Sequence, residues 1–295
     1  MAARQKTIAS CTCGALLCIA LACHAVLLAQ PAPKRIISLV PAVTEMLFAI
    51  GAGPEVVAIS SFDSYPPEAK SLPRVGALLD PNVERILSLK PDLVIVYGSQ
   101  QELKEQLARA SIPIFDYRHA GLADVSTTIR TLGERTGRVV QANDVVARIQ
   151  QGLADIRRRV GDRPRPRTLL VFGREPGALR GIYASGGVGF LDDMLRIAGG
   201  DNVFADIKKE AVEASTELIL SRRPDVILEI RTSDTSSAPA TLAAELALWK
   251  SLSSVPAVRN DRVQFLADDR IVIPGPRVVE GTRTIAQALH PDAFK

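Results

Sequence analysis

Short apolar runs of strand length alternate with segments of helical spacing along most of this 295-residue chain. The apolar runs predict strands near residues 35–40, 56–59, 93–97, 112–117, 168–172, 182–184, 226–230 and 263–266. Apolar positions three and four residues apart predict helices near residues 43–50, 101–110, 190–198, 216–221, 242–251 and 277–289. Strands and helices that alternate in this way are typical of an α/β fold with parallel sheets.

One piece of this pattern occurs twice. The sequence Glu84-Arg-Ile-Leu-Ser-Leu-Lys-Pro-Asp-Leu-Val-Ile-Val96 returns as Glu217-Leu-Ile-Leu-Ser-Arg-Arg-Pro-Asp-Val-Ile-Leu-Glu229. In each copy a short helix ends before a proline, which cannot continue it, and an apolar strand follows. Asn82 and Ser215 are each placed to cap the helix. We therefore predict two Rossmann-like lobes with a small ligand held between them.

A single long helix is predicted between the two lobes. Apolar residues alternate at spacings of three and four from Val139 to Val160. At 1.5 Å per residue this helix would be roughly 35 Å long, enough to reach from one lobe to the other. The predicted organisation is an N-terminal lobe at 34–136, a linking helix at 137–163 and a C-terminal lobe at 167–291.

Residues 1–29 have the features of an export signal. Arg4 and Lys6 precede a long uncharged run that ends in small residues. The box ending at Cys23 resembles a lipoprotein cleavage site, so cleavage near Ala29, a lipid anchor at Cys23 and a retained membrane anchor are alternatives. All four cysteines lie in this segment, which excludes thiol chemistry and a disulfide framework from the exported part. We expect a periplasmic or otherwise exported protein.

Composition and motifs argue against nucleic-acid binding and against catalysis. The formal charge is only +4, and 23% of the residues are charged. The chain has no Gly-x-Ser-x-Gly elbow and no histidine pair at helical spacing. Asp192 and Asp193 fall in the first turn of a predicted helix, where the helix dipole alone explains acidic residues. We expect neither an enzyme nor a resident cofactor.

A glycine-rich turn, Ser185-Gly-Gly-Val-Gly189, lies between a predicted strand and a helix. Backbone N–H groups at such a place can hold an anion. The turn lacks the third glycine of a dinucleotide fingerprint and the lysine of a phosphate loop. We interpret it as a turn that presents backbone to a ligand, and a two-lobed enzyme that binds a nucleotide is the alternative from another class.

Several side chains at strand ends and in loops are candidates for ligand contact. A large flat macrocycle needs aromatic faces against it, and four aromatic residues fall outside core spacings: Tyr65, Tyr97, Tyr183 and Phe190. Three arginines near strand ends could bind ligand carboxylates, with solvation at the surface as the alternative: Arg174, Arg180 and Arg231. His119 could ligate a metal centre from one axial side, with Tyr117 as its rival.

Six motifs in combination resemble the iron-chelate and cobalamin family of ABC-importer substrate-binding proteins, and the resemblance covers about residues 34–291. They are Ile37-Ser-Leu-Val-Pro-Ala-Val-Thr-Glu45, Ser64-Tyr-Pro-Pro-Glu68, Asn82-Val-Glu-Arg-Ile86, Lys90-Pro-Asp-Leu-Val-Ile95, Gly199-Gly-Asp-Asn-Val203 and Gly275-Pro-Arg-Val278. The resemblance implies two α/β lobes joined by one helix, a ligand between them and little hinge motion. It also implies a monomer that binds a metal chelate without changing it and docks on a permease dimer.

Within this family the chain is most similar to cobalamin-binding members, which makes a corrinoid the favoured ligand and haem or a ferric siderophore the alternative. Tyr65 matches a corrin-contacting tyrosine, Tyr97 an aromatic position and Asp269 a polar ligand contact. Leu78 stands in the stretch where cobalamin binders have a tryptophan, and Ile273 stands in place of an arginine. The resemblance further implies that the repeated glutamates, Glu84 and Glu217, dock onto arginines of the two permease subunits.

Overall fold

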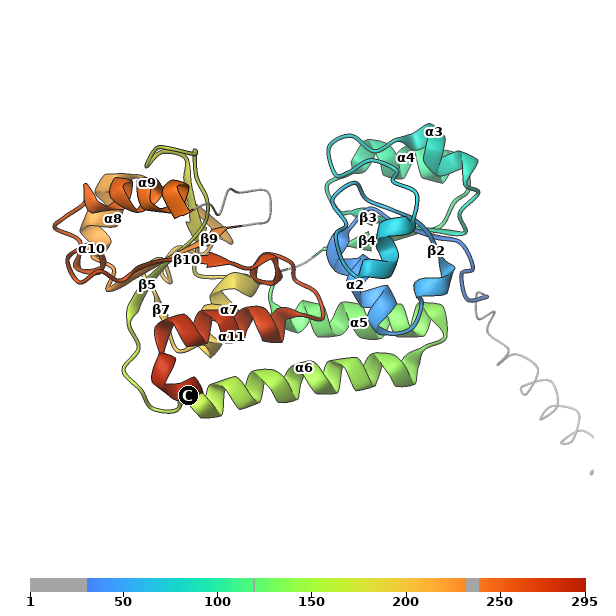
Figure 1. The fold of residues 1–295 in the computed structure, drawn as a ribbon. Helices are drawn as coiled ribbons and strands as arrows, with labels where there is room; N and C mark the ends of the chain where they lie inside the picture. Colours follow the sequence, from blue (N-terminus) through green and yellow to red (C-terminus); the bar gives the residue numbers. More distant parts are fainter. Residues whose placement is uncertain (1–30, 119, 232–238) are drawn as a thin grey trace, which may run out of the picture. The chain divides into compact units, whose positions relative to one another are not determined.

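The computed structural model describes residues 31–118, 120–231 and 239–295 (Figure 1). Residues 33–295 form one compact unit. The predicted export segment with Cys23, and His119, lie outside the described residues. Among the described helices, none combines the length and the apolarity needed to cross a bilayer.

The N-terminal lobe is a four-stranded parallel sheet in the order β2-β1-β3-β4. Its strands are β1 (Ile36–Ser38), β2 (Val56–Ile59), β3 (Leu93–Tyr97) and β4 (Ile114–Tyr117). Its helices are α2 (Pro41–Ala49), α3 (Val83–Ser88), α4 (Gln101–Arg109) and α5 (Leu122–Thr136), with short 3₁₀ turns η2 (Gly53–Glu55) and η3 (Pro67–Ser71).

Both faces of this sheet are covered, which explains why its strands are continuous apolar runs. Along β3, Leu93 and Ile95 belong to one buried cluster together with residues of α2 and α5. Val94 and Val96 point to the other face, where they pack with residues of α3 and α4. Because side chains alternate across a strand, each face receives every second residue.

The linking helix is α6 (Val139–Val160), which matches the predicted run of apolar spacings and lies within the predicted linking segment 137–163. It packs against α5 and against α11 (Val278–Leu289), near the end of the chain. One hydrophobic cluster runs through these three helices and includes Val43 of α2 and Met194 of α7 (Phe190–Ile197). The two sheets are therefore joined by continuous packing as well as by the chain.

The C-terminal lobe is built on strands β5 to β10. They are β5 (Arg167–Gly173), β6 (Ile182–Ser185), β7 (Asp201–Asn202), β8 (Ala211–Ala214), β9 (Val226–Arg231) and β10 (Val263–Ala267). The remaining helices are α8 (Thr216–Arg222), α9 (Pro239–Lys250) and α10 (Pro256–Arg259), with turns η4 (Asp269–Ile271) and η5 (Pro291–Phe294). The sheet order is β10-β9-β5-β6-β8, and β7 pairs with β5.

The predicted two-lobed α/β fold with parallel sheets is confirmed, and the second sheet adds an antiparallel edge. β10, β9, β5 and β7 are parallel, whereas β6 runs antiparallel to both β5 and β8. β8 alternates exposed and buried residues, as an edge strand does. It escaped the sequence prediction because only Val212 in it is a strong strand former.

The sequence repeat is also a structural repeat. Asn82 accepts a hydrogen bond from the Arg85 N–H at 2.9 Å, and Ser215 accepts one from the Leu218 N–H at 3.2 Å, so both predicted caps are confirmed. Lys90 and Arg223 occupy the same position before the proline and share a φ of 49°. Each copy therefore ends its helix with one left-handed residue before the next strand begins.

Candidate functional site

A pocket of about 500 Å³ opens where all four parallel strands of the first sheet end. Its first-lobe wall comes from residues that follow β1 and β2 and from the last residues of β3 and β4: Val40, Pro41, Ala42, Ser61, Phe62, Asp63, Ser64, Tyr97 and Tyr117. The carboxyl ends of parallel strands are the usual place for a ligand in open α/β sheets. This wall is therefore positioned by the topology of the lobe.

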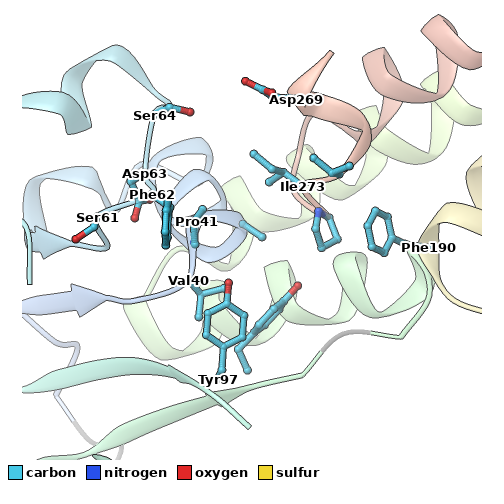
Figure 2. Close-up of a pocket in the computed structure, with 14 residues that line it drawn as sticks. Val40, Pro41, Ser61, Phe62, Asp63, Ser64, Tyr97, Phe190, Asp269 and Ile273 are labelled. Atoms are coloured by element: carbon cyan, nitrogen blue, oxygen red, sulfur yellow. The ribbon is translucent and has the colours of Figure 1, made fainter. Parts of the chain in front are cut away.

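The opposite wall comes from the second lobe. Figure 2 shows Phe190 and Ile273 facing Phe62 and Tyr97 of the first lobe. Phe190 is the first residue of α7, and Asp269, Val272, Ile273 and Pro274 connect β10 to α11. A second hollow of about 310 Å³ adjoins the pocket, because Phe190 and Val272 line both.

The floor of the pocket carries two phenol rings. Tyr97 and Tyr117 meet edge to face, with ring centroids 6.2 Å apart and planes at 69°. Burial raises the pKa of Tyr97 to about 12 and also raises the pKa of Tyr117. Both rings are therefore neutral phenols near pH 7, available as flat apolar surfaces.

The charges around the pocket are acidic. Asp63 and Asp269 line it, and Glu210 lines the adjoining hollow. No lysine, arginine or histidine occurs among the described residues that line either one. Burial raises the pKa of Asp63 to about 7.

Arg174 and Arg231, predicted as carboxylate binders or solvated surface residues, are instead buried in a charged network of the second lobe. Arg174 donates to Glu229 at 3.0 Å and also to Glu245, while Arg231 donates to Glu229 at 3.1 Å. The two arginine side chains are 2% and 7% exposed. Their charges are thus matched within the protein.

Arg180, by contrast, is exposed beside Glu175, as the solvation alternative predicted.

Three of the six predicted ligand contacts come together in the pocket: Tyr97, Phe190 and Asp269. Leu78 lies elsewhere on the first lobe, in a shallow hollow beside α4. Tyr183 is 45% exposed on β6 and packs against Phe172, with ring centroids 6.5 Å apart.

Tyr65 also does not line this pocket. It lines a separate hollow of about 720 Å³ behind α2, together with Arg277. The Arg277 guanidinium carbon lies 3.9 Å from the centre of the Tyr65 ring. The resemblance therefore predicts Tyr65 as a ligand contact, whereas in the structure Tyr65 lies outside the pocket that Tyr97, Phe190 and Asp269 line.

Most of the described residues that line the pocket were not predicted as ligand contacts, among them Phe62 and Asp63. Tyr117 was considered only as a rival metal ligand, and Ile273 only as a departure from the family pattern. Phe62 and Asp63 lie in the loop that follows β2, and Tyr117 ends β4. The rule that ligands meet the carboxyl ends of parallel strands would have found all three.

The glycine turn does not present free backbone. Gly186 N–H donates to the Glu210 carbonyl at 3.0 Å, and Gly187 N–H donates to the Ile207 carbonyl at 2.8 Å. A Cβ on Gly187 would lie 2.2 Å from the Ala205 carbonyl oxygen. The interpretation as a turn that presents backbone to a ligand is therefore wrong for Gly186 and Gly187. Both positions need glycine because the backbone of residues 205–210 passes too close to leave room for a side chain.

Asp192 and Asp193 also have specific partners beyond the helix dipole. Asp192 accepts a hydrogen bond from the Asn202 side chain at 2.9 Å. Asp193 accepts one from the Leu122 N–H at 2.9 Å and so caps the start of α5 in the other lobe.

Glu84 and Glu217 both occupy the second position of their helices and are exposed. The backbone N–H of Glu217 itself and the side chain of Ser215 lower the pKa of Glu217. Within the described ranges, no group of three or more His, Cys, Asp or Glu side chains could hold a metal ion.

Comparison with known proteins agrees with this architecture. Residues 36–269 match the family described as periplasmic binding protein. The ABC transporter substrate-binding lipoprotein YvrC of Bacillus subtilis (strain 168) is 31% identical over 268 residues, which cover 89% of this chain and 82% of the lipoprotein.

Solved structures that are similar in both sequence and fold include a vitamin B12 binding protein and a heme-binding protein. The periplasmic vitamin B12 binding protein BtuF of Vibrio cholerae is 26% identical with a TM-score of 0.74, covering 89% of this chain and 99% of that one. The periplasmic heme-binding protein RhuT of Roseiflexus sp. RS-1, in its apo form, is 27% identical with a TM-score of 0.74, covering 88% and 99%. The chain belongs to the periplasmic binding protein family, and it is an ABC-transporter substrate-binding protein rather than an enzyme.

Proposed function

We propose that the protein captures a corrinoid in this pocket outside the cytoplasm and delivers it, chemically unchanged, to an ABC importer. The observation that carries the proposal is a pocket with aromatic faces and no basic side chain among its described lining residues. The corrin periphery carries amides, which need hydrogen-bond acceptors rather than cations. The similarity to a vitamin B12 binding protein supports the same ligand class.

Haem is the second candidate, because Tyr97 and Tyr117 line the pocket and a tyrosine can hold haem iron. Two observations count against it. Burial raises the pKa of both phenols, which opposes the phenolate form that binds iron. The propionates of haem would also lack a cationic partner, since Arg174 and Arg231 are already paired with Glu229 and Glu245. Carboxylate siderophores meet the same difficulty.

Visible absorbance tests the ligand class directly. The purified protein is incubated separately with increasing amounts of cyanocobalamin, cobinamide, haemin and ferric siderophores. Unbound ligand is removed by gel filtration, and the visible absorbance of the protein fraction measures the ligand that stays bound. We expect saturation with a corrinoid and no shift of the absorption bands that would signal a new axial ligand. Saturation with haemin alone would replace the corrinoid by the second candidate and leave the family unchanged.

We further propose that Glu84 and Glu217 dock the loaded protein on a permease dimer. Both are exposed at the same position of repeated helices, one per lobe. Opposite charges at the rim of an interface chiefly set orientation and encounter rate. Changing both to Arg should abolish uptake into vesicles that carry the cognate importer and leave corrinoid affinity within about threefold. Loss of affinity as well would point to a structural role, and normal uptake would move the docking surface elsewhere.

A further inference from the structure

One carboxyl group in the pocket has no partner for its oxygens. Asp63 lines the pocket and is 4% exposed. Neither of its side-chain oxygens has a hydrogen-bond partner among the described residues. The Thr44 hydroxyl and the Ser60 backbone both lie near enough to lower the pKa of Asp63, although burial outweighs them. The Thr44 hydroxyl donates its hydrogen bond to the Val40 carbonyl at 3.3 Å. A buried polar group in this state destabilises the empty protein, and a ligand donor would relieve it.

The loop that carries Asp63 is held firmly in place. Arg74 donates from one nitrogen to the carbonyl oxygens of Ser60, at 2.8 Å, and of Asp63, at 2.6 Å. The Phe62 N–H donates to the Ser60 hydroxyl at 3.2 Å. The loop leaves the Phe62 side chain 71% exposed at the pocket and buries Asp63. The carboxyl position is therefore fixed before any ligand arrives, which lowers the entropy cost of binding to it.

The surroundings of Asp63 favour a hydrogen-bond donor on the ligand over an anion. Asp269 lines the same pocket and Glu210 the adjoining hollow, and the described lining residues include no basic side chain. A ligand carboxylate would lose its hydration beside these acids without gaining a cation. An amide N–H would instead meet acceptors.

We propose that Asp63 determines specificity by accepting a hydrogen bond from an N–H at the edge of the bound chelate, so that the pocket selects amide-bearing macrocycles over carboxylate-bearing ones. The proposal rests on the proposed function and deepens it, because it names the peripheral group that the site recognises. It applies to any planar metal chelate that enters the pocket.

Two corrinoids with the same ring and metal test the proposal: dicyanocobinamide, which carries amides, and dicyanocobyrinic acid, which carries carboxylic acids. Their affinities are measured by calorimetry for the wild type, for Asp63→Asn and for Asp63→Ala. Asp80→Asn is the matched control, because Asp80 is exposed on the same lobe and does not line this pocket. Thermal unfolding verifies that each variant folds.

The wild type and Asp80→Asn should bind the amide corrinoid at least tenfold more tightly than the acid. Asp63→Asn, which can also donate a hydrogen bond, should tighten binding of the acid and narrow that ratio at least threefold. Asp63→Ala should weaken binding of the amide corrinoid about tenfold. An unchanged ratio in Asp63→Asn, or a wild type that prefers the acid, would overturn the proposal.

If the protein binds no corrinoid, the proposed function fails. The inference is then tested with a second pair of ligands: haemin, which carries two propionic acids, and the haemin derivative in which both propionic acids are converted to amides. Asp63→Asn must then tighten haemin binding more than diamide binding, and equal effects overturn the inference. A wild type that binds neither pair overturns both the function and the inference.

Discussion

Arg277 of the second lobe donates two hydrogen bonds to the buried carboxylate of Glu45 in the first lobe, one of them at 2.9 Å. The Glu45 side chain is 2% exposed and the Arg277 side chain 21%. Desolvation raises the pKa of Glu45 although Arg277 opposes the shift. Arg277 is also the residue that precedes α11, so this pair fixes the start of α11 against α2.

Removing Arg277 should therefore destabilise the fold. Arg277→Ala leaves a buried carboxylate without its cation, and we expect the free energy of unfolding to fall by roughly 3 kcal/mol. Urea denaturation measures this change. Arg158→Ala is the control, because its pair with Asp155 is exposed and should contribute less than about 1 kcal/mol. Equal small losses in the two variants would contradict the interlobe role of Arg277.

Asp63 should make stability depend on pH. Its pKa is about 7 in the folded protein and 3.8 in the unfolded chain. Between these values the folded state holds the extra proton, so the free energy of unfolding falls as pH rises from about 4 to about 7. This change in protonation lowers the free energy of unfolding by about 4 kcal/mol at most. Chemical denaturation measures the free energy of unfolding of the wild type and of Asp63→Asn across this pH range. Relative to Asp63→Asn, the wild type should lose stability as the pH rises from about 4 to about 7. A difference between the two proteins that does not change with pH would refute the raised pKa of Asp63.

The two lobes should move little when the ligand binds. α6 is one continuous helix, and a single hydrophobic cluster connects α2, α5, α6, α7 and α11. A hinge would have to break this packing. Small-angle scattering with and without corrinoid should give nearly the same radius of gyration. A contraction of several ångströms would show that the helix does not hold the lobes in place.

Tyr97 should contribute more to affinity than the equally aromatic Tyr183. Tyr97 lines the pocket, whereas Tyr183 is exposed on β6 and does not line it. Tyr97→Ala should weaken corrinoid binding by about 1 to 3 kcal/mol, the scale of one aromatic face buried against a ligand. Tyr183→Ala should change affinity less than threefold. Equal effects in a calorimetric titration would place the ligand outside this pocket.

Local sequence signals predicted much of this structure. The spacing of apolar residues predicted a helix from Val139 to Val160, and α6 has these ends. The spacing is informative because a helix stays buried along one face only if apolar residues recur every three or four positions. Both helix caps were also predictable, since Asn82 and Ser215 act on an N–H only three residues away. The resemblance predicted Tyr97 and Asp269 as ligand contacts, and both line the same pocket.

Properties that depend on distant contacts were not predictable. The direction of a strand is set by its neighbours in the sheet and not by its own residues. The sequence of β6 therefore does not indicate that it runs antiparallel to β5 and β8. Arg174 and Glu229 are 55 residues apart in sequence, and their pairing decided whether the arginine faces a ligand. In the sequence, Asp63 looks like any polar residue of a loop. Only the surrounding fold leaves its carboxyl buried without a hydrogen-bond partner among the described residues.

Calorimetric titration of the purified protein with cobinamide and cyanocobalamin tests the central claim most directly. The account predicts saturable heat at one corrinoid per chain, with the ligand recovered chemically unchanged. The absence of heat with either corrinoid, together with saturation by haemin, would contradict it.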